Sequence, residues 1–342
     1  MTRHILAAVL MVVGALTSVR VVEPAVASNN VEHVFYVAAN GKDEWSGQLE
    51  APVAAGTDGP FTTLTRARDA VRQLKYQNGG QLDQPVNVLV RGGTYRFTEP
   101  LRLSGGDSGT LRCPVTYAAF PGETPVLSGG RIVDDWQPYQ GQILQTSLPQ
   151  VREDRLWFRQ LFYNGQRMTR ARWPNDDHGD PLYGGWAFIE KVISPNGGPP
   201  IAFQFEQDVF PHRWSNPTQA EVFVIPGKCW FSDSIRIRHV DWQQRIIHLT
   251  RPVGPSRNTL GLATHLLAGN RFYVENNLED LTGPGQWCLD AEQGILYFWP
   301  PDDGLARAEV TVPVTDRIVQ MIGQVDEPVA HVKFRGFTFT QT

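Results

Sequence analysis

The sequence predicts a mainly β protein made of many short strands. Its 32 glycines and 25 prolines amount to about 17% of the 342 residues, against roughly 12% in average usage. Short runs of β-type residues recur about every dozen positions, separated by turn signals such as Asn40-Gly41. Strands of this length and spacing fit either a β-sandwich or the stacked coils of a β-solenoid.

The first 27 residues have the pattern of a secretory signal peptide. A short basic start at residues 2–4 precedes an apolar run over residues 5–16, and an Ala-Val-Ala stretch ending at Ala27 offers a small-x-small cleavage site. The apolar run is too short to span a bilayer, which takes about 20 residues. We therefore expect a secreted or periplasmic protein that is cleaved near Ala27 and keeps no membrane anchor.

Residues 28–130 are predicted to open with a strand over Val34–Val37 and to contain one amphipathic helix after Thr62. Threonines precede the first turn and can cap it, and Asn78-Gly79-Gly80 supplies a stop signal. The apolar positions that share one face of this helix are Leu64, Ala67, Val71 and Leu74. Further short strands are predicted at residues 86–90, 95–97, 101–103, 115–117 and 126–127, with glycine-rich corners between them.

The composition and the strand spacing change over residues 131–309, which we interpret as an inserted β-rich domain. Nine of the ten tryptophans fall there, and long irregular loops separate the strand patterns. Strands are predicted inside it at residues 161–163, 221–225, 235–239, 246–249 and 295–298. The first pattern resumes over residues 310–342, with strands predicted at 310–314 and 318–322 and an alternating run over 331–339.

The charge balance and the cysteines exclude several classes of protein. The 31 basic and 35 acidic residues give a net charge of −4, which argues against a nucleic-acid-binding surface. Cys113, Cys229 and Cys288 lie far apart and lack the spacing of zinc ligands. We therefore expect no metal and no other cofactor. Either one disulfide with one free thiol or three buried thiols fit an exported protein.

Several segments, in order along the chain, resemble secreted right-handed parallel β-helix proteins of the pectin-lyase-like type. In those proteins a helix like the one predicted here closes the open end of the solenoid. The matching segments are residues 35–43, 59–71, 91–95, 106–110 and 117–130. Residues 161–175, 271–276, 285–290 and 296–301 are similar to the inserted β-domain of glycoside hydrolase families 120 and 141.

This resemblance implies a domain order and an activity. Residues 28–130 would form the helical cap and first coils, residues 131–309 the insert, and residues 310–342 a resumed coil. The implied activity is hydrolysis of plant or algal polysaccharide by a pair of carboxylates on coils that follow the insert. Only the start of such coils precedes Thr342, so we expect the chain to be the truncated N-terminal part of the enzyme. Its catalytic residues would lie beyond that position, and the chain alone would be inactive.

One loop of the insert combines aromatic, amide and acidic residues, which hold sugar rings by stacking and hydrogen bonding. It gives the predicted substrate-binding residues Trp173, Asn175, Asp176, Asp177, His178 and Trp186. A purely structural loop is the alternative interpretation. The adjacent pairs Asp134-Asp135 and Asp302-Asp303 fit solvated turns better than a catalytic pair, because neighbours on an extended chain point to opposite sides.

Three other functions remain open at this point. A non-catalytic carbohydrate-binding protein would carry exposed tryptophans along one groove and no convergent acids. A polysaccharide lyase would need basic groups and commonly Ca²⁺ beside an acidic sugar, and the sequence offers no clustered aspartates for that ion. A structural surface protein would show no sugar-sized cleft.

Overall fold

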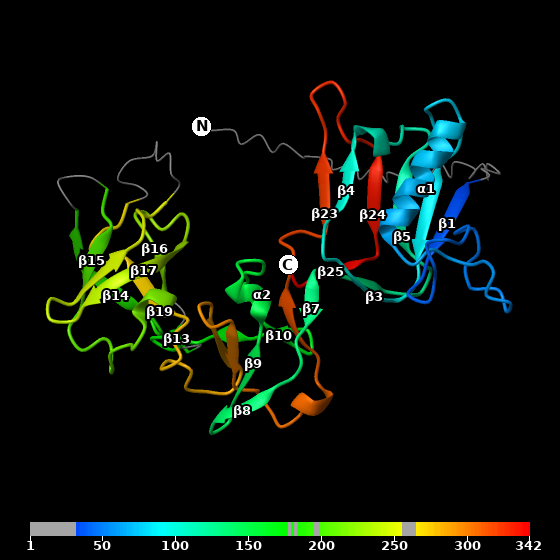
Figure 1. Cartoon of the computed structure of the whole chain (residues 1–342). Helices are drawn as coiled ribbons and strands as arrows, with labels where there is room; N and C mark the ends of the chain where they lie inside the picture. Colours follow the sequence, from blue (N-terminus) through cyan, green and yellow to red (C-terminus); the bar gives the residue numbers. More distant parts are fainter. Residues whose placement is uncertain (1–31, 177–178, 181–182, 195–198, 255–264) are drawn as a thin grey trace, which may run out of the picture.

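The computed structural model describes residues 32–176, 179–180, 183–194, 199–254 and 265–342. The protein is mainly β, as the sequence predicts, and has two parts (Figure 1). We call the part that contains β1–β6, β23–β25 and the helix α1 the parallel unit. We call the part from β7 to β22 the insert.

Three sheets form the parallel unit. The first has the order β1 (His33–Val37), β2 (Val86–Val90), β5 (Val115–Ala119) and β24 (Val332–Arg335). The second contains β3 (Gly93–Arg96), β6 (Pro125–Ser128) and β25 (Thr338–Thr340), and the third pairs β4 (Leu101–Ser104) with β23 (Val319–Ile322). Every strand pair in these three sheets is parallel.

The chain visits the three sheets in turn. Strands β2, β3 and β4 make one turn, and β5 and β6 begin the next. The chain then leaves through the insert and returns as β23, which pairs with β4 and completes the interrupted turn. Strands β24 and β25 follow on the first and second sheets. In Figure 1 the red β23 and the cyan β4 therefore lie side by side, although they are far apart in the sequence.

Apolar side chains fill the inside of this winding. Val88 on β2 is fully buried and lies beside Tyr117 on β5, whose ring stacks on Phe334 of β24 with centroids 5.0 Å apart. Helix α1 (Leu64–Gln77) covers the β1 side of this core. Its buried residues are Leu64, Ala67, Ala70 and Val71. The predicted helix is thus confirmed, and Thr63 caps it by accepting a hydrogen bond from the Arg66 amide at 3.0 Å.

Arginine–carboxylate pairs tie the corners of successive turns together. The Arg91 guanidinium donates to the Glu123 carboxylate at 2.7 Å, and the Gly92 amide donates to the same carboxylate. Arg72 of α1 donates to Asp107 at 2.6 Å, next to the short η1 turn (Gly105–Asp107). The glycine-rich sequence segments around these residues therefore build corners.

The alternating run over residues 331–339 was predicted as one strand and is divided instead. Val332–Arg335 belongs to the first sheet and Thr338–Thr340 to the second, with a corner at Gly336. Gly336 has φ of 76°, and a Cβ there would lie 2.8 Å from the Ala119 side chain. Alternation continues through the corner because both strands place apolar side chains inward, so the pattern alone conceals the bend.

The insert contains three mostly antiparallel sheets. One has the order β11 (Gln166–Arg167), β10 (Phe162–Tyr163), β22 (Val310–Pro313) and β7 (Gly130–Ile132). The second has the order β12 (Thr169–Arg170), β20 (Gln286–Asp290), β21 (Ile295–Phe298), β9 (Ile143–Ser147) and β8 (Gln137–Gln140). Short helical turns are α2 (Pro149–Arg152), η3 (Pro217–Gln219) and η5 (Leu305–Arg307).

The third sheet of the insert is closed. Its order is β13 (Arg172–Trp173), β19 (Arg271–Glu275), β14 (Ala187–Ile193), β15 (Ala202–Phe205), β18 (Ile246–Leu249), β17 (Asp233–Asp241) and β16 (Glu221–Ile225). Strand β16 also pairs with β19, so six of these strands form a barrel. Alternate residues point inward, for example Val222, Val224, Phe272 and Val274, all fully buried.

The insert leaves and rejoins the parallel unit through two neighbouring strands. Strand β7 at its start pairs antiparallel with β22 at its end. The parallel winding resumes at Val319, so residues 310–313, which the sequence placed in the resumed coil, pair within the insert.

The remaining sequence expectations concern membranes and thiols. The predicted signal peptide lies outside the described residues. Within the described ranges, no helix is long and apolar enough to cross a membrane. Cys113, Cys229 and Cys288 are free thiols, and only Cys288 is buried.

Candidate functional site

An exposed tryptophan marks the outer surface of the insert where the segment after α2 meets the barrel. Leu156 and Phe158 are buried in the core that β20 and β21 line, so the extended chain turns Trp157 and Arg159 outward. The Trp157 side chain is 44% exposed. The guanidinium of Arg236 lies over its ring at 4.7 Å from the centroid, which is a cation–π contact.

Trp157 is part of the wall of an open recess of about 390 Å³. This volume lies within the range of small-molecule sites, roughly 300–1,000 Å³. The recess is lined by Asp154, Leu156, Trp157, Arg159, Glu221 and Arg236. Glu221 on β16 and Arg236 on β17 are cross-strand partners, which places both at the same level of the barrel surface.

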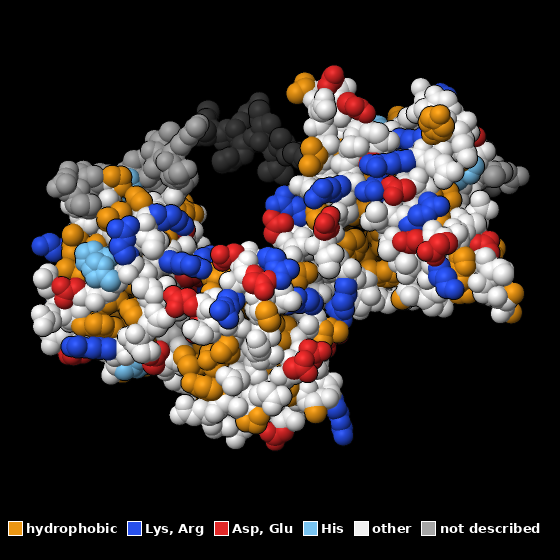
Figure 2. Space-filling view, in the orientation of Figure 1, with side chains coloured by type: hydrophobic (Ala, Val, Ile, Leu, Met, Phe, Trp, Pro, Cys, Tyr) orange, Lys and Arg blue, Asp and Glu red, His pale blue; other side chains and the backbone are white. Residues whose placement is uncertain are grey.

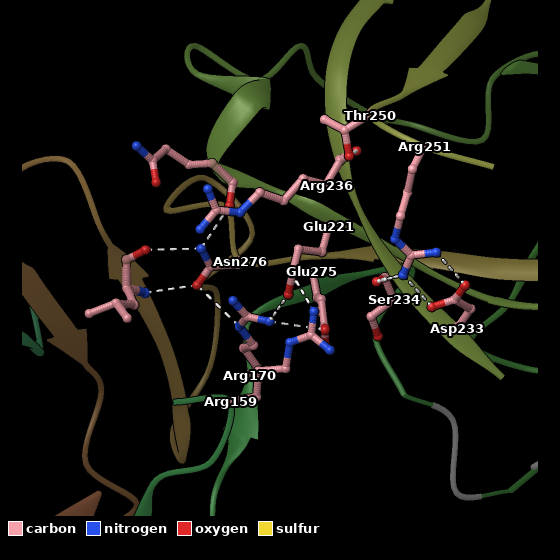
Figure 3. Close-up of polar contacts among 12 residues, drawn as sticks. Arg159, Arg170, Glu221, Asp233, Ser234, Arg236, Thr250, Arg251, Glu275 and Asn276 are labelled. Atoms are coloured by element: carbon pink, nitrogen blue, oxygen red, sulfur yellow. Dashed lines mark hydrogen bonds and ion pairs between the residues drawn. The ribbon is translucent and has the colours of Figure 1, made fainter. Parts of the chain in front are cut away.

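Glu221 forms the floor of the recess and is held by two arginines (Figure 3). It is only 2% exposed, and its carboxylate accepts from Arg159 at 2.6 Å and from Arg170 at 2.5 Å. Burial alone would raise the pKa of Glu221, but the attraction of the two guanidiniums and their hydrogen bonds outweigh it and lower that pKa. Glu221 is therefore ionised at neutral pH.

Arg170 links the recess to the rest of the insert. One of its terminal nitrogens contacts Glu221 and also Glu275 at 3.1 Å, and its Nε donates to the Asn276 side chain at 3.2 Å. Asn276 in turn donates to the backbone carbonyl oxygens of Gln219 and Leu289, both at 2.9 Å. This buried network joins the barrel to β20 of the neighbouring sheet and fixes the floor of the recess.

Glu221 and Glu275 invite comparison with the paired carboxylates of glycosidases. Both accept from the same Arg170 nitrogen, Glu221 at 2.5 Å and Glu275 at 3.1 Å. The two carboxylates are therefore about as close as those of a retaining glycosidase, which lie about 5–5.5 Å apart. Such catalysis needs one carboxyl group that stays protonated as an acid and another that is free to attack. Glu221 is ionised and clamped, so this pair serves binding and structure better than bond cleavage.

The structure places the predicted residue Trp173 on the inner side of the barrel wall. Trp173 pairs with the inward-pointing Val274, and its indole nitrogen donates to the Val209 carbonyl at 2.7 Å. Its ring packs edge-on against His212, which contacts the fully buried Asp280 at 2.9 Å. Burial raises the pKa of Asp280 although its hydrogen-bond partners oppose this. Trp173 is therefore half-buried among packing partners.

Asn175 and Asp176 do not line the recess. Asn175 accepts from the side chain of Gln286 at 3.1 Å, which secures the loop to β20. Asp176 is exposed and lies 4.0 Å from Arg172. Asp177 and His178 lie outside the described residues.

Trp186 lies on the outer side of the barrel, opposite to Trp173. Its ring packs on Tyr273 with centroids 5.3 Å apart, and Tyr273 stacks on Phe223 at 4.7 Å. Phe223 and Tyr273 form the next outward-facing cross-strand pair on β16 and β19, two residues along each strand from the Glu221–Glu275 pair. Trp186 therefore shares a surface with the recess, whereas the structure does not bring Trp186 and Trp173 together on one face.

Trp157, Arg159 and Arg236 were absent from the predicted site, although the sequence holds a signal for the first two. In the Arg155-Leu-Trp-Phe-Arg159 segment, apolar residues that become buried alternate with Trp157 and the arginines. That alternation indicates a tryptophan turned outward between two cations. Arg236 comes from β17, far along the sequence from Trp157, so no local pattern reveals their contact.

The space-filling view shows how charge is distributed around this region. On the face in Figure 2, basic and acidic side chains intermingle where the insert meets the parallel unit. In the described ranges, no group of three or more His, Cys, Asp or Glu residues is arranged to hold a metal ion.

Comparisons with known proteins identify the fold of the chain. No protein-family model and no curated protein matches the sequence. A solved structure described as a glycoside hydrolase superposes with a TM-score of 0.70 at 24% identity, covering 91% of this chain and 51% of the other. The chain therefore has a glycoside hydrolase-like fold. It spans about half the length of that neighbour.

Two more distant structures were also found. XylC in complex with xylose gives a TM-score of 0.26 at 15% identity, over 78% of this chain and 31% of its own. The Gp54 tailspike of Acinetobacter baumannii bacteriophage AP22, in complex with a capsular saccharide, gives 0.15 at 7% identity, over 80% and 32%. Neither superposition is close enough to add to the argument.

Proposed function

We propose that this chain is part of an extracellular carbohydrate-active protein related to glycoside hydrolases, and that its insert binds saccharide in the recess beside Trp157. The single observation that carries the proposal is the superposition on a glycoside hydrolase over 91% of the chain. We further propose that the parallel unit is the first coils of a right-handed parallel β-helix of the pectin-lyase-like type. The insert would then correspond to that of families 120 and 141.

The β-helix proposal is supported by the path of the chain. Each turn places one strand on each of three parallel sheets, and α1 covers one end of the apolar interior. The insert separates β6 from β23, and the chain then continues the same winding through β23 to β25. This is the arrangement expected when a domain is inserted into one coil. Export is the proposal that follows from the N-terminal pattern, and the N-terminal sequence of the mature protein tests it: Ser28 is expected at its start.

Binding is tested with a panel of soluble plant and algal polysaccharides by affinity electrophoresis of the full exported chain. We expect retardation by at least one polysaccharide, and we expect Trp157→Ala to reduce it because Arg236 loses the ring that orients it. Trp230→Ala is the matched control, since Trp230 is 70% exposed and does not line the recess. The proposal fails if no polysaccharide retards the chain, or if both variants behave alike.

We expect the chain to bind without cleaving. Glu221 and Glu275 are both held by Arg170, and Glu221 is ionised, so this pair offers no protonated acid and no free nucleophile, and Asp154 alone does not make a catalytic pair. A reducing-end assay on each retained polysaccharide should give no signal above buffer. Release of reducing ends that is abolished by Glu221→Gln would contradict this and place catalysis in the recess.

A further inference from the structure

We propose that the recess selects saccharides carrying a carboxylate, that is, uronic acid residues, through the guanidinium of Arg236. This deepens the proposed function and rests on it, because it assumes that the ligand of the recess is a saccharide. The argument depends on which charges around the recess are already paired.

The acidic residues of the floor are compensated. Glu221 is bonded to Arg159 and Arg170, and Glu275 shares the same Arg170 nitrogen. Two guanidiniums thus balance two carboxylates. The charges of this network are paired within the protein, so the network presents no net charge to a ligand in the recess.

Arg236 differs from those two arginines. Arg236 is exposed, and its guanidinium donates no hydrogen bond to any of the described residues. The guanidinium lies against the face of Trp157, which orients it without occupying its N–H groups. A planar guanidinium with free N–H groups matches the two oxygens of a carboxylate, and such charge-assisted pairs are the stronger hydrogen bonds.

The stacking also constrains how a sugar is held. Arg236 covers one face of the Trp157 ring, so a sugar cannot lie against that face. The ligand instead meets the edge of the guanidinium, with Arg159 beside it, because the side chain of Arg159 is 43% exposed and only one of its nitrogens is bonded to Glu221. Trp157 is thus a positioning residue and Arg236 the specificity-determining one.

Asp154 gives the proposal a second, opposite test. It lines the recess and is exposed, and its carboxylate would repel that of the ligand. Removing its charge should therefore strengthen the binding of an anionic sugar, whereas removing the charge of Arg236 should weaken it.

The experiment is calorimetric titration of the full chain with a uronic acid oligosaccharide and with the same oligosaccharide as its neutral methyl ester. We expect the acid form to bind at least tenfold more tightly, and we expect added salt to weaken it. Arg236→Ala should raise the Kd of the acid form about tenfold or more and that of the ester several times less, because the ester lacks the charge that the guanidinium pairs with. Asp154→Asn should lower the Kd of the acid form.

Arg238→Ala is the matched control, because it removes the same charge from the same strand outside the recess. If the ester binds as well as the acid, or if Arg236→Ala and Arg238→Ala have the same effect, the inference is overturned while saccharide binding stands. If neither these probes nor any polysaccharide of the panel binds, the proposed function and the inference fail together.

Discussion

The parallel unit and the insert are stabilised in different ways. Inside the parallel unit, each turn repeats the one below it, and side chains such as Val88, Tyr117 and Phe334 stack in register. The joint between the barrel and its neighbouring sheet occurs once, and the buried charged and amide groups Glu221, Arg170 and Asn276 hold it. Non-directional apolar contacts fill the interior of the repeated turns, and ion pairs such as Arg91–Glu123 lie at their corners. At the unique joint, directional charged contacts lie in the buried interior instead.

The largest expected effect tests the joint of the insert. Glu221→Gln removes the charge that compensates Arg170 and Arg159, and breaking a buried pair from one side costs about 3–5 kcal/mol. Urea unfolding followed by tryptophan fluorescence should show this loss, because nine of the ten tryptophans lie in the insert. Glu190→Gln, which breaks the partly exposed pair with Arg245, should cost less than about 1 kcal/mol. Equal losses of stability in the two variants would show that the buried ion pair of the joint contributes no more than a surface ion pair.

The next effect tests the apolar winding. Leu127 on β6 is fully buried inside the parallel unit, and Leu127→Ala should cost about 3 kcal/mol through lost packing and a cavity. Far-UV circular dichroism in urea should register the change, and added salt should not alter it. A matching shift of the tryptophan transition would show that both parts unfold as one unit, which would break the comparison.

The pH dependence sharpens the comparison further. The pKa of Glu221 in the folded chain lies below its ordinary value of 4.5, so its contribution is fully present above that pH and is lost as pH falls through the folded-state pKa. The difference in unfolding free energy between the wild type and Glu221→Gln should therefore shrink below about pH 4.5. For Leu127→Ala the difference should stay constant over the same range. A constant difference for Glu221→Gln would contradict the ion-pair account.

The smallest expected effect concerns the cap of α1. Thr63→Ala removes the side-chain oxygen that accepts from the Arg66 amide and should cost about 1 kcal/mol. Thr63→Ser keeps that oxygen and should be close to neutral. The dichroism transition is the measurement, and a cost for serine as large as that for alanine would assign the effect to the threonine methyl group instead.

Local patterns predicted many of the elements. Strands over residues 86–90, 221–225, 246–249 and 295–298 form with the predicted boundaries, because apolar runs between turn residues define them. Strand β14 was missed, and the reason is a break in alternation: its pairing with β15 shifts register between Ile189 and Lys191.

The candidate site was harder to predict because it is assembled across the sequence. Trp186 lies on the barrel face that carries the recess, whereas Trp173 points to the other side. Substrate binding by either residue stays a prediction. The contacts of Glu221 with Arg159 and Arg170 join residues from different sheets. Arg236 lies over Trp157 because the barrel packs against the segment after α2, and composition or spacing carries no information about that contact.

The pairing of β7 with β22 has a consequence for how such a chain can change. The two crossings between the parts are hydrogen-bonded to each other, from Gly130–Pro313 to Ile132–Thr311. The parallel unit is therefore connected to the whole insert as it would be to a two-stranded hairpin. The pairing of β7 with β22 offsets the entropic cost of holding the two ends of this long insertion together. We therefore expect changes within the insert, its recess included, to leave the register of the parallel unit intact, because only this strand pair carries the chain between the two parts.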